Sequence, residues 1–294
     1  MYLAVTPFHP DDIPALINAG ADIFIAGNAA FANRLATSFS MTELEEMTKV
    51  LHQQGKQIYV PLNLIVHELS LETLEPFLTQ LRDWQVDGIL FGDLAVYQIA
   101  KRLGMEDRLI YHPETLNTNT YDPIFWAKQG IGGVVLAKEI TLTDIEQIYQ
   151  ASSLKIVMVG HGHLNMFHSR RPLIESYFKH KDEAYQSYLN NRNLRLVEEI
   201  RSESYPIMQD EHGTHIFRER PMMSYLDMPR LRKVVDVFII DGILQTPAEL
   251  LIATKNYKTL GDNPSEERAK QLHDTYSSTH DTGFLHQQTV YVKQ

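Results

Sequence analysis

Residues 133–160, GVVLAKEITLTDIEQIYQASSLKIVMVG, contain the structural unit that decides the fold. The two ends of this stretch, 133–137 and 155–160, are short runs rich in Val, Ile and small residues, which is typical of strands covered on both faces. Between them, Thr141 and Asp144 mark the start of a helix. A strand, a helix and a second strand in this order predict a parallel βαβ unit.

The same alternation continues in both directions along the chain. Upstream, Ser40 and Glu43 form the capping box of a clear amphipathic helix, which ends at Gly55. The strands predicted in this way comprise residues 2–6, 21–27, 57–63, 87–92, 108–112, 133–137, 155–160 and 234–241. Eight such units favour a closed (β/α)8 barrel over an open doubly wound sheet.

The connection between the seventh and eighth strands is much longer than the others. About 70 residues separate Gly160 from Val234, and such an excess is normally a functional insertion. We therefore predict a TIM-like α/β barrel over residues 1–260, with an insertion at 161–233. The polar, weakly patterned stretch 261–294 is expected to form a C-terminal extension that is partly disordered.

The composition is that of an ordinary globular protein, except that cysteine is absent. This absence excludes disulfides, a thiolate nucleophile and a cysteine-held iron–sulfur site in this chain. The chain has no signal-peptide pattern and no apolar run near the ~18 residues of a membrane span, so we expect a cytoplasmic protein. The net charge of −10 argues against non-specific coating of nucleic acid but is compatible with a local basic groove.

Polar side chains follow most of the predicted strands, where a barrel of this kind carries its active site. These residues are Thr6, His9, Asn28, Asn33, Asn63, His67, Asp93, His112, Glu114, Lys138, Glu139, His161, His163 and Asp241. Helix capping accounts for Asn28 and Asp93, whereas other members directly follow buried strands. We predict catalytic roles for Glu139 and His161 and substrate-binding roles for Asn63 and His112.

The sharpest local feature is HGHLNMFHSRRP, residues 161–172, directly after the seventh strand. Adjacent arginines suit a planar anion such as a carboxylate or phosphate, so Arg170 and Arg171 are predicted to bind substrate. The alternative is that both arginines form structural ion pairs with Glu175 or Glu211.

The histidines of this segment offer a second interpretation, a metal site formed by His161, His163 and His168. No acidic ligand stands near them in the sequence, so we predict no metal. The chain also lacks a dinucleotide-binding glycine motif, a Walker loop, a GxSxG elbow and an HExxH helix. Residue spacing alone therefore specifies no reaction.

A second cluster, QDEHGTHIF at residues 209–217, surrounds a glycine within the insertion. Alternation after Gly213 predicts a small hairpin. Asp210 is a candidate for acid–base catalysis and His212 for substrate binding. The alternative, more common for such turns, is that these side chains tie the insertion to the barrel.

Several segments in unbroken order resemble the collagenase-like peptidase family, U32. They are AVTP, INAGADIFIAG, FSMTELEEMTKVLHQQGKQIYVPLN, GVVLAKEITLTDI, HGHLNMFHSRRPLIESYF and YPIMQDEHGTHIF, and the resemblance extends over residues 3–260. The family signature after the seventh strand contains cysteines, which hold an iron–sulfur cluster. Asn165 and Pro172 stand at two of these positions, and a third falls near Met223.

The resemblance implies oxygen-independent hydroxylation, which family members carry out on a tRNA wobble uridine with prephenate, on ribosomal RNA or on a ubiquinone precursor. Without cysteine, this chain resembles the short member of a two-subunit pair that forms 5-hydroxyuridine in tRNA. The resemblance implies that a cysteine-bearing paralogue supplies the cluster. It also implies tRNA and a prephenate-like small carboxylate as ligands, with phosphates meeting the arginines Arg170, Arg171, Arg192 and Arg195.

Two further functions are compatible with these sequence features. The family label implies a hydrolase, a collagenase-like protease, for which an acid pair such as Glu139 with Asp210 is the remaining candidate because nucleophile and zinc motifs are absent. The third alternative is a non-catalytic scaffold subunit.

Overall fold

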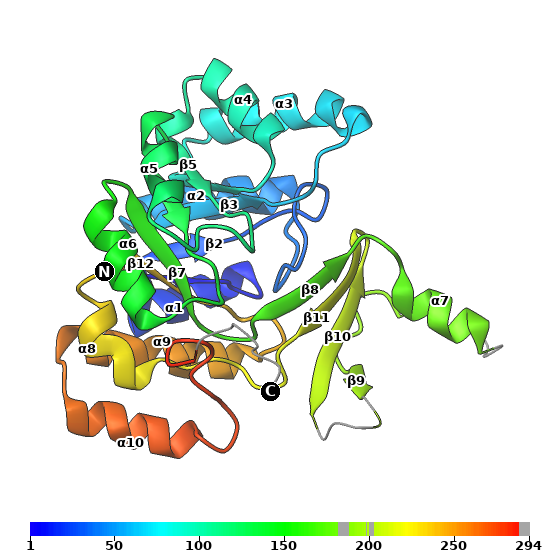
Figure 1. Ribbon diagram of the computed structural model, residues 1–294. Coiled ribbons are helices and arrows are strands. Elements are labelled where there is room, and N and C mark those ends of the chain that lie inside the picture. The colour runs from blue at the N-terminus through cyan, green and yellow to red at the C-terminus, as the bar shows by residue number, and fades with distance from the viewer. Residues whose placement is uncertain (182–187, 198, 200–202, 288–294) are drawn as a thin grey trace.

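The computed structural model describes residues 1–181, 188–197, 199 and 203–287. Eight parallel strands close into a barrel in the order β1-β12-β7-β6-β5-β4-β3-β2 (Figure 1). Their bounds are β1 (Tyr2–Val5), β2 (Ile23–Ile25), β3 (Gln57–Leu62), β4 (Gly88–Phe91), β5 (Leu109–Tyr111), β6 (Gly133–Val135), β7 (Lys155–His161) and β12 (Val237–Ile240). The predicted (β/α)8 barrel with an insertion between its seventh and eighth strands is therefore confirmed.

Helices connect the strands and surround the barrel. They are α1 (Ile13–Ala19), α2 (Met41–Gln53), α3 (Glu68–Asp83), α4 (Leu94–Arg102), α5 (Tyr121–Lys128), α6 (Leu142–Ala151), α8 (Met228–Leu231) and α9 (Pro247–Asp262). The capping box predicted at Ser40 and Glu43 is present, and Thr141 with Asp144 caps α6 in the same way. Within the described part of the chain, no helix has the length and apolar character needed to cross a bilayer.

The insertion forms a separate four-stranded antiparallel sheet beside the barrel, with strand order β8-β11-β10-β9 (Figure 1). It comprises β8 (Asn165–Ser169), α7 (Leu173–His180), β9 (Arg195–Val197), β10 (Ser204–Asp210) and β11 (Gly213–Phe217). The predicted hairpin is β10–β11, closed by the pair Asp210 and Gly213. Gly213 has a φ of +134°, and a Cβ there would overlap the carbonyl of Ser169, so both conformation and space require glycine.

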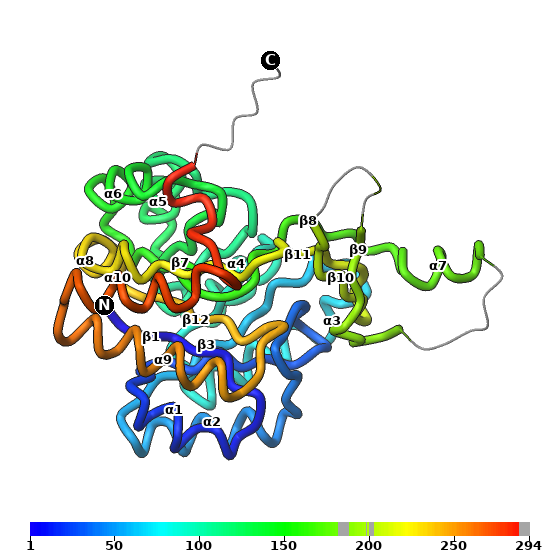
Figure 2. Tube along the Cα trace, turned by 90° about the horizontal axis from the view of Figure 1, so that it is seen from below, coloured from blue at the N-terminus to red at the C-terminus, as the bar shows by residue number. Residues whose placement is uncertain are grey.

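The C-terminal part of the chain packs against the barrel. Helix α9 is followed by α10 (Glu266–Tyr276), and the segment after it lies beside β7 and the connection from β11 (Figure 2). Asp281 pairs with Met222, and Phe284 and Leu285 are buried. Of the stretch 261–294 for which partial disorder is expected, residues 288–294 lie outside the described residues.

Candidate functional site

Two adjoining pockets open at the C-terminal ends of the barrel strands. The inner pocket is narrow, with a volume of about 80 Å³, and Thr6, Val159 and Asp241 are among the residues that line it. The outer pocket, of about 610 Å³, lies between the loops after β3 to β6 and strand β8 of the insertion. Both pockets share a wall made of Arg34, Asn63, His112, Glu114, Lys138 and Asn165. We call this shared wall and the two pockets the barrel mouth.

An ion network forms the charged part of the shared wall. Glu114 accepts a hydrogen bond from Arg34 through Oε1 and from Lys138 Nζ through Oε2, the latter at 2.6 Å. The side chains of Arg34 and Lys138 are only 7% and 12% exposed, so both cations need a counter-charge inside the protein. Burial would raise the pKa of Glu114, but the two cations outweigh it and hold that pKa well below its usual value. Glu114 is therefore ionised at neutral pH.

His112 lies beside this network as a neutral side chain. Its Nε2 atom is 3.6 Å from Glu114 Oε1 and has no hydrogen-bond partner within the described ranges. Burial lowers the pKa of His112 to about 4, although the charge of Glu114 opposes the shift. An uncharged imidazole with a free nitrogen can donate to or accept from a ligand in the mouth.

Asp241 is the second carboxyl group of the mouth and lies at the floor of the inner pocket. Its Oδ1 accepts from the Thr6 hydroxyl at 3.3 Å and from the backbone N–H of Ile243 at 3.0 Å. Burial raises the pKa of Asp241, while the Ile243 hydrogen bond and the charge of Lys138 oppose the rise. This group therefore holds its proton more readily than Glu114 does.

The shared wall of the barrel mouth carries more positive than negative charge, although the whole chain carries a net charge of −10. Arg192 from the insertion lines a neighbouring pocket and donates to the carbonyl of Leu35 at 3.1 Å. Burial lowers the pKa of Arg192, and the charge of Asp241 partly opposes this shift. In the shared wall, two cations, Arg34 and Lys138, thus face one firmly ionised carboxylate, Glu114. A small anion is the ligand class that this charge distribution suits.

The structure places His161 away from the barrel mouth, in neither pocket. Strict alternation would turn His161 inward like Val159, but Gly160 is an extra residue, because Val159 pairs with Ile239 and His161 with Ile240. The bulge turns the imidazole outward, where its ring packs against His280 at a centroid distance of 5.3 Å. The pairing of β7 with β12, rather than the alternation of side chains along β7, decides how His161 is oriented.

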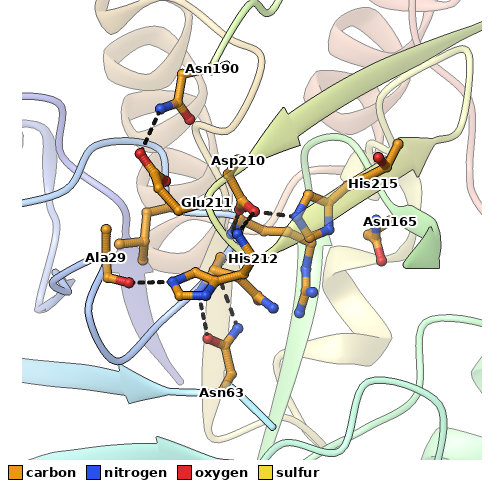
Figure 3. A network of polar contacts seen from close by, with 12 residues as sticks. Ala29, Asn63, Asn165, Asn190, Asp210, Glu211, His212 and His215 are labelled. Atoms are coloured by element: carbon orange, nitrogen blue, oxygen red, sulfur yellow. Dashed lines mark hydrogen bonds and ion pairs between the residues drawn. The ribbon is translucent and has the colours of Figure 1, made fainter. Parts of the chain in front are cut away.

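Asp210 and His212 connect the insertion to the barrel (Figure 3). Asp210 accepts from the backbone N–H of Arg34 at 3.2 Å and forms an ion pair with His215 at 3.0 Å. The His212 imidazole contacts the carbonyl of Ala29 in the β2–α2 loop. These contacts support the structural alternative for the two residues, and they hold in place the loop that carries Arg34.

We expect Asp210→Asn to lower the free energy of unfolding at pH 7 by roughly 2 kcal/mol. Burial acts to raise the pKa of Asp210, but His215 and the backbone donors lower it to about 2. The ionised Asp210 therefore stabilises the folded state fully above pH 3.8, the ordinary pKa of an aspartate, and this contribution is lost as the pH falls through about 2. Urea unfolding measures the difference. Glu211→Gln, an exposed neighbour, is the control, and equal stability of Asp210→Asn and wild type would contradict the assignment.

The remaining predicted residues lie at different places. Asn63 lines both pockets and is held by the Asn33 backbone, whose N–H donates to its Oδ1 at 3.0 Å. Glu139 is exposed and lines the outer pocket. Arg170 and Arg171 are exposed, and within the described ranges neither forms an ion pair with Glu175 or Glu211.

The three histidines considered as metal ligands point to different surroundings. His161 packs against His280, His163 contacts the carbonyl of Arg218 at 3.1 Å, and His168 stacks on His215. Among the described residues, no group of three His, Asp or Glu side chains is arranged to hold a metal ion.

The positions of the family cysteines do not fit an iron–sulfur cluster in this chain. Asn165 lines both pockets and donates through its amide to the carbonyl of Phe167 at 3.0 Å. Pro172 is exposed at the start of α7, and Met223 is buried in the core. None of these side chains provides the thiolate that such clusters require.

Sequence reasoning missed Arg34, which is central to the barrel mouth. Its loop is long and irregular, so the residue does not directly follow a strand. Its backbone has a φ of +52°, and its N–H donates to Asp210, 176 positions further along the chain. No local sequence pattern indicates a contact between two residues that are so far apart in the chain.

Comparisons with known proteins agree with this architecture. The model of peptidase family U32 matches residues 9–293. The chain is similar to the tRNA hydroxylation protein P2 of Bacillus subtilis (strain 168), with 32% identity over 98% of each chain. It is 25% identical to the tRNA hydroxylation protein P1 of that organism over 56% of this chain and 40% of that one. A dihydrodipicolinate synthase structure covers 94% of this chain and 82% of its own at a TM-score of 0.51 and 11% identity, a likeness of fold alone.

Proposed function

Because this chain belongs to peptidase family U32 and is similar over its length to a tRNA hydroxylation protein P2, we propose that it is a subunit of a tRNA-hydroxylating system. The reaction proposed is 5-hydroxylation of the wobble uridine. The observation that carries the proposal is the 32% identity to that protein over 98% of both chains. An alignment of this extent leaves no large part of either chain without a counterpart.

The proposed system contains a second, cysteine-bearing member of the family. A P1 and a P2 protein occur in the same Bacillus strain, and the chain is similar to both. This chain has no cysteine, so an iron–sulfur cluster used by the system would be held by the partner. In this arrangement the cluster supplies electron transfer, and the present chain supplies binding surfaces for the ligands.

The barrel mouth is the proposed binding site for the small carboxylate of the reaction, a prephenate-like molecule. Arg34 and Lys138 are desolvated cations from two different loops, and charge-assisted hydrogen bonds to a carboxylate are strong in such surroundings. His112 and Asn63 line the same wall and can hydrogen-bond the remaining polar groups of the ligand. Exposed arginines of the insertion, Arg170 among them, are the proposed contacts to tRNA phosphates.

Nucleoside analysis of tRNA from a strain that lacks this gene tests the proposed function. We expect nucleosides derived from 5-hydroxyuridine to disappear in the deletion strain and to return when the wild-type gene is supplied on a plasmid. Arg170→Ala together with Arg171→Ala should restore them only in part, because fewer phosphate contacts lower the affinity for tRNA. Unchanged tRNA nucleosides in the deletion strain would refute the proposal.

The peptidase and scaffold alternatives give different results. The acid pair considered for a peptidase is Glu139 with Asp210, but Asp210 is engaged by His215 and the Arg34 backbone, while Glu139 lies in the outer pocket. Cleavage of denatured collagen by the purified chain, lost on Glu139→Gln, would support a peptidase. A scaffold would require the chain for modification but tolerate His112→Ala and Lys138→Met.

A further inference from the structure

Glu114 stands where an anion would bind. Its carboxylate spans Arg34 and Lys138, one cation on each oxygen, at the wall that the two pockets share. We propose that Glu114 is a resident carboxylate that occupies the anion subsite of the barrel mouth, and that a small carboxylate ligand binds by displacing it. This inference rests on the proposed function for the ligand class and adds how the same site is regulated.

The two cations converge without help from the Glu114 loop. Arg34 belongs to the β2–α2 loop, where the contact of its backbone with Asp210 fixes it, and Lys138 follows β6 directly. Glu114 comes from a third segment, the loop after β5. Removing its carboxylate therefore leaves a pair of positive groups at the spacing that bridges one carboxylate. A ligand carboxylate with one oxygen on each cation would make the same two contacts.

Exchange, rather than simultaneous binding, follows because Glu114 already occupies the contacts to both cations that a ligand carboxylate would use. Arg34 and Lys138 together carry two positive charges, and they are largely withdrawn from water. Glu114 neutralises part of this charge when no ligand is present, which makes the empty site compatible with burial. A second carboxylate at the same two cations would stand close to the first, and like charges at that separation repel.

The backbone of Glu114 is compatible with a side chain that can leave. Its φ is +71°, in the left-handed region that non-glycine residues seldom adopt, and Asn117 in the same loop has a φ of +66°. The side chain is also 23% exposed, more than either cation, and it lines both pockets, of which the larger outer one gives it space to move.

The consequence is selectivity among anions. A simple anion must replace the Glu114 contacts and gains nothing beyond them, so it binds weakly. A larger ligand that also reaches His112, Asn63 and the inner pocket gains contacts that Glu114 does not make, and these favour displacement. Glu114 is thus a specificity-determining residue for the ligand.

Calorimetric titration of the purified full-length chain with malonate, a small dicarboxylate, tests the proposal. Glu114→Gln keeps the size and polarity of the side chain but removes its charge, so we expect it to bind malonate at least about 10-fold more tightly than wild type, a difference of about 1.4 kcal/mol. Acetate should raise the melting temperature of this variant but not that of wild type. The matched control is Glu146→Gln, which removes a glutamate paired with Arg230 at 2.8 Å outside the mouth and should leave malonate binding unchanged.

Equal or weaker malonate binding by Glu114→Gln would overturn the proposal, because a glutamate that merely positions the cations helps the ligand instead of competing with it. If this variant fails to fold, Glu114→Asp serves instead, since its carboxylate is set back by one methylene and is expected to lose contact with at least one of the two cations. It should bind malonate more tightly than wild type, and no gain overturns the proposal equally. The titration needs neither tRNA nor a partner protein. A negative titration would therefore refute the displacement of Glu114, whereas unchanged tRNA nucleosides in the deletion strain would refute the proposed function.

Discussion

Replacing Lys138 with methionine should lower the affinity of the barrel mouth for malonate by about 10-fold, because the dianionic ligand loses more attraction to this lysine than the displaced Glu114 does. In cells, the same variant should fail to restore 5-hydroxyuridine-derived nucleosides to a deletion strain. The physical reason is that Lys138 is one of two cations that meet at Glu114 Oε1 and Oε2, and methionine keeps its length but not its charge. The remaining pair, Arg34 with Glu114, is electrically neutral, so the variant should fold.

The control for this prediction is Lys128→Met, at an exposed lysine at the end of α5. It removes the same charge from the chain without touching the mouth, and both malonate affinity and tRNA modification should match wild type. Full modification by Lys138→Met would show that the ion network has only a structural role. Circular dichroism and the melting temperature of each variant separate loss of binding from loss of folding.

Acidification from pH 7 to pH 4 should destabilise the protein by about 3 kcal/mol through His161 alone. Burial lowers the pKa of His161 to about 3, and nearby His280 and His163 add to the shift. The ring is enclosed by Tyr225, Tyr257 and His280, which provide no negative charge. The unfolded chain takes up a proton near pH 6.5 whereas the folded chain does not until about pH 3, so stability falls as the pH drops between these values.

His161→Phe tests this prediction because phenylalanine fills the aromatic cluster but does not titrate. Urea unfolding at pH 7, 5.5 and 4 should show a shallower loss of stability for the variant than for wild type, by about 3 kcal/mol over this range. His180→Phe, at an exposed position on α7, should keep the wild-type slope. Parallel pH profiles for wild type and His161→Phe would contradict the prediction.

Part of the candidate site was predictable because parallel barrel strands all end at one face. This rule alone placed Asn63, His112, Glu114 and Lys138 among the candidates, and all four line the shared wall of the two pockets. The rule failed for His161. One extra residue near the end of β7 shifts the inward–outward alternation, so that His161 points away from the barrel interior. The bulge depends on pairing with β12, which lies far along the chain.

The sequence by itself determined the barrel, its insertion and the absence of thiolate ligands. These features depend on composition and on local patterns such as apolar runs and the capping boxes at Ser40 and Thr141, which involve residues a few positions apart. Only the tertiary structure decided that Arg34, Glu114 and Lys138 form one ion network. The physical reason is that these side chains belong to three separate strand-to-helix connections, and closure of the barrel is what brings them within hydrogen-bonding distance.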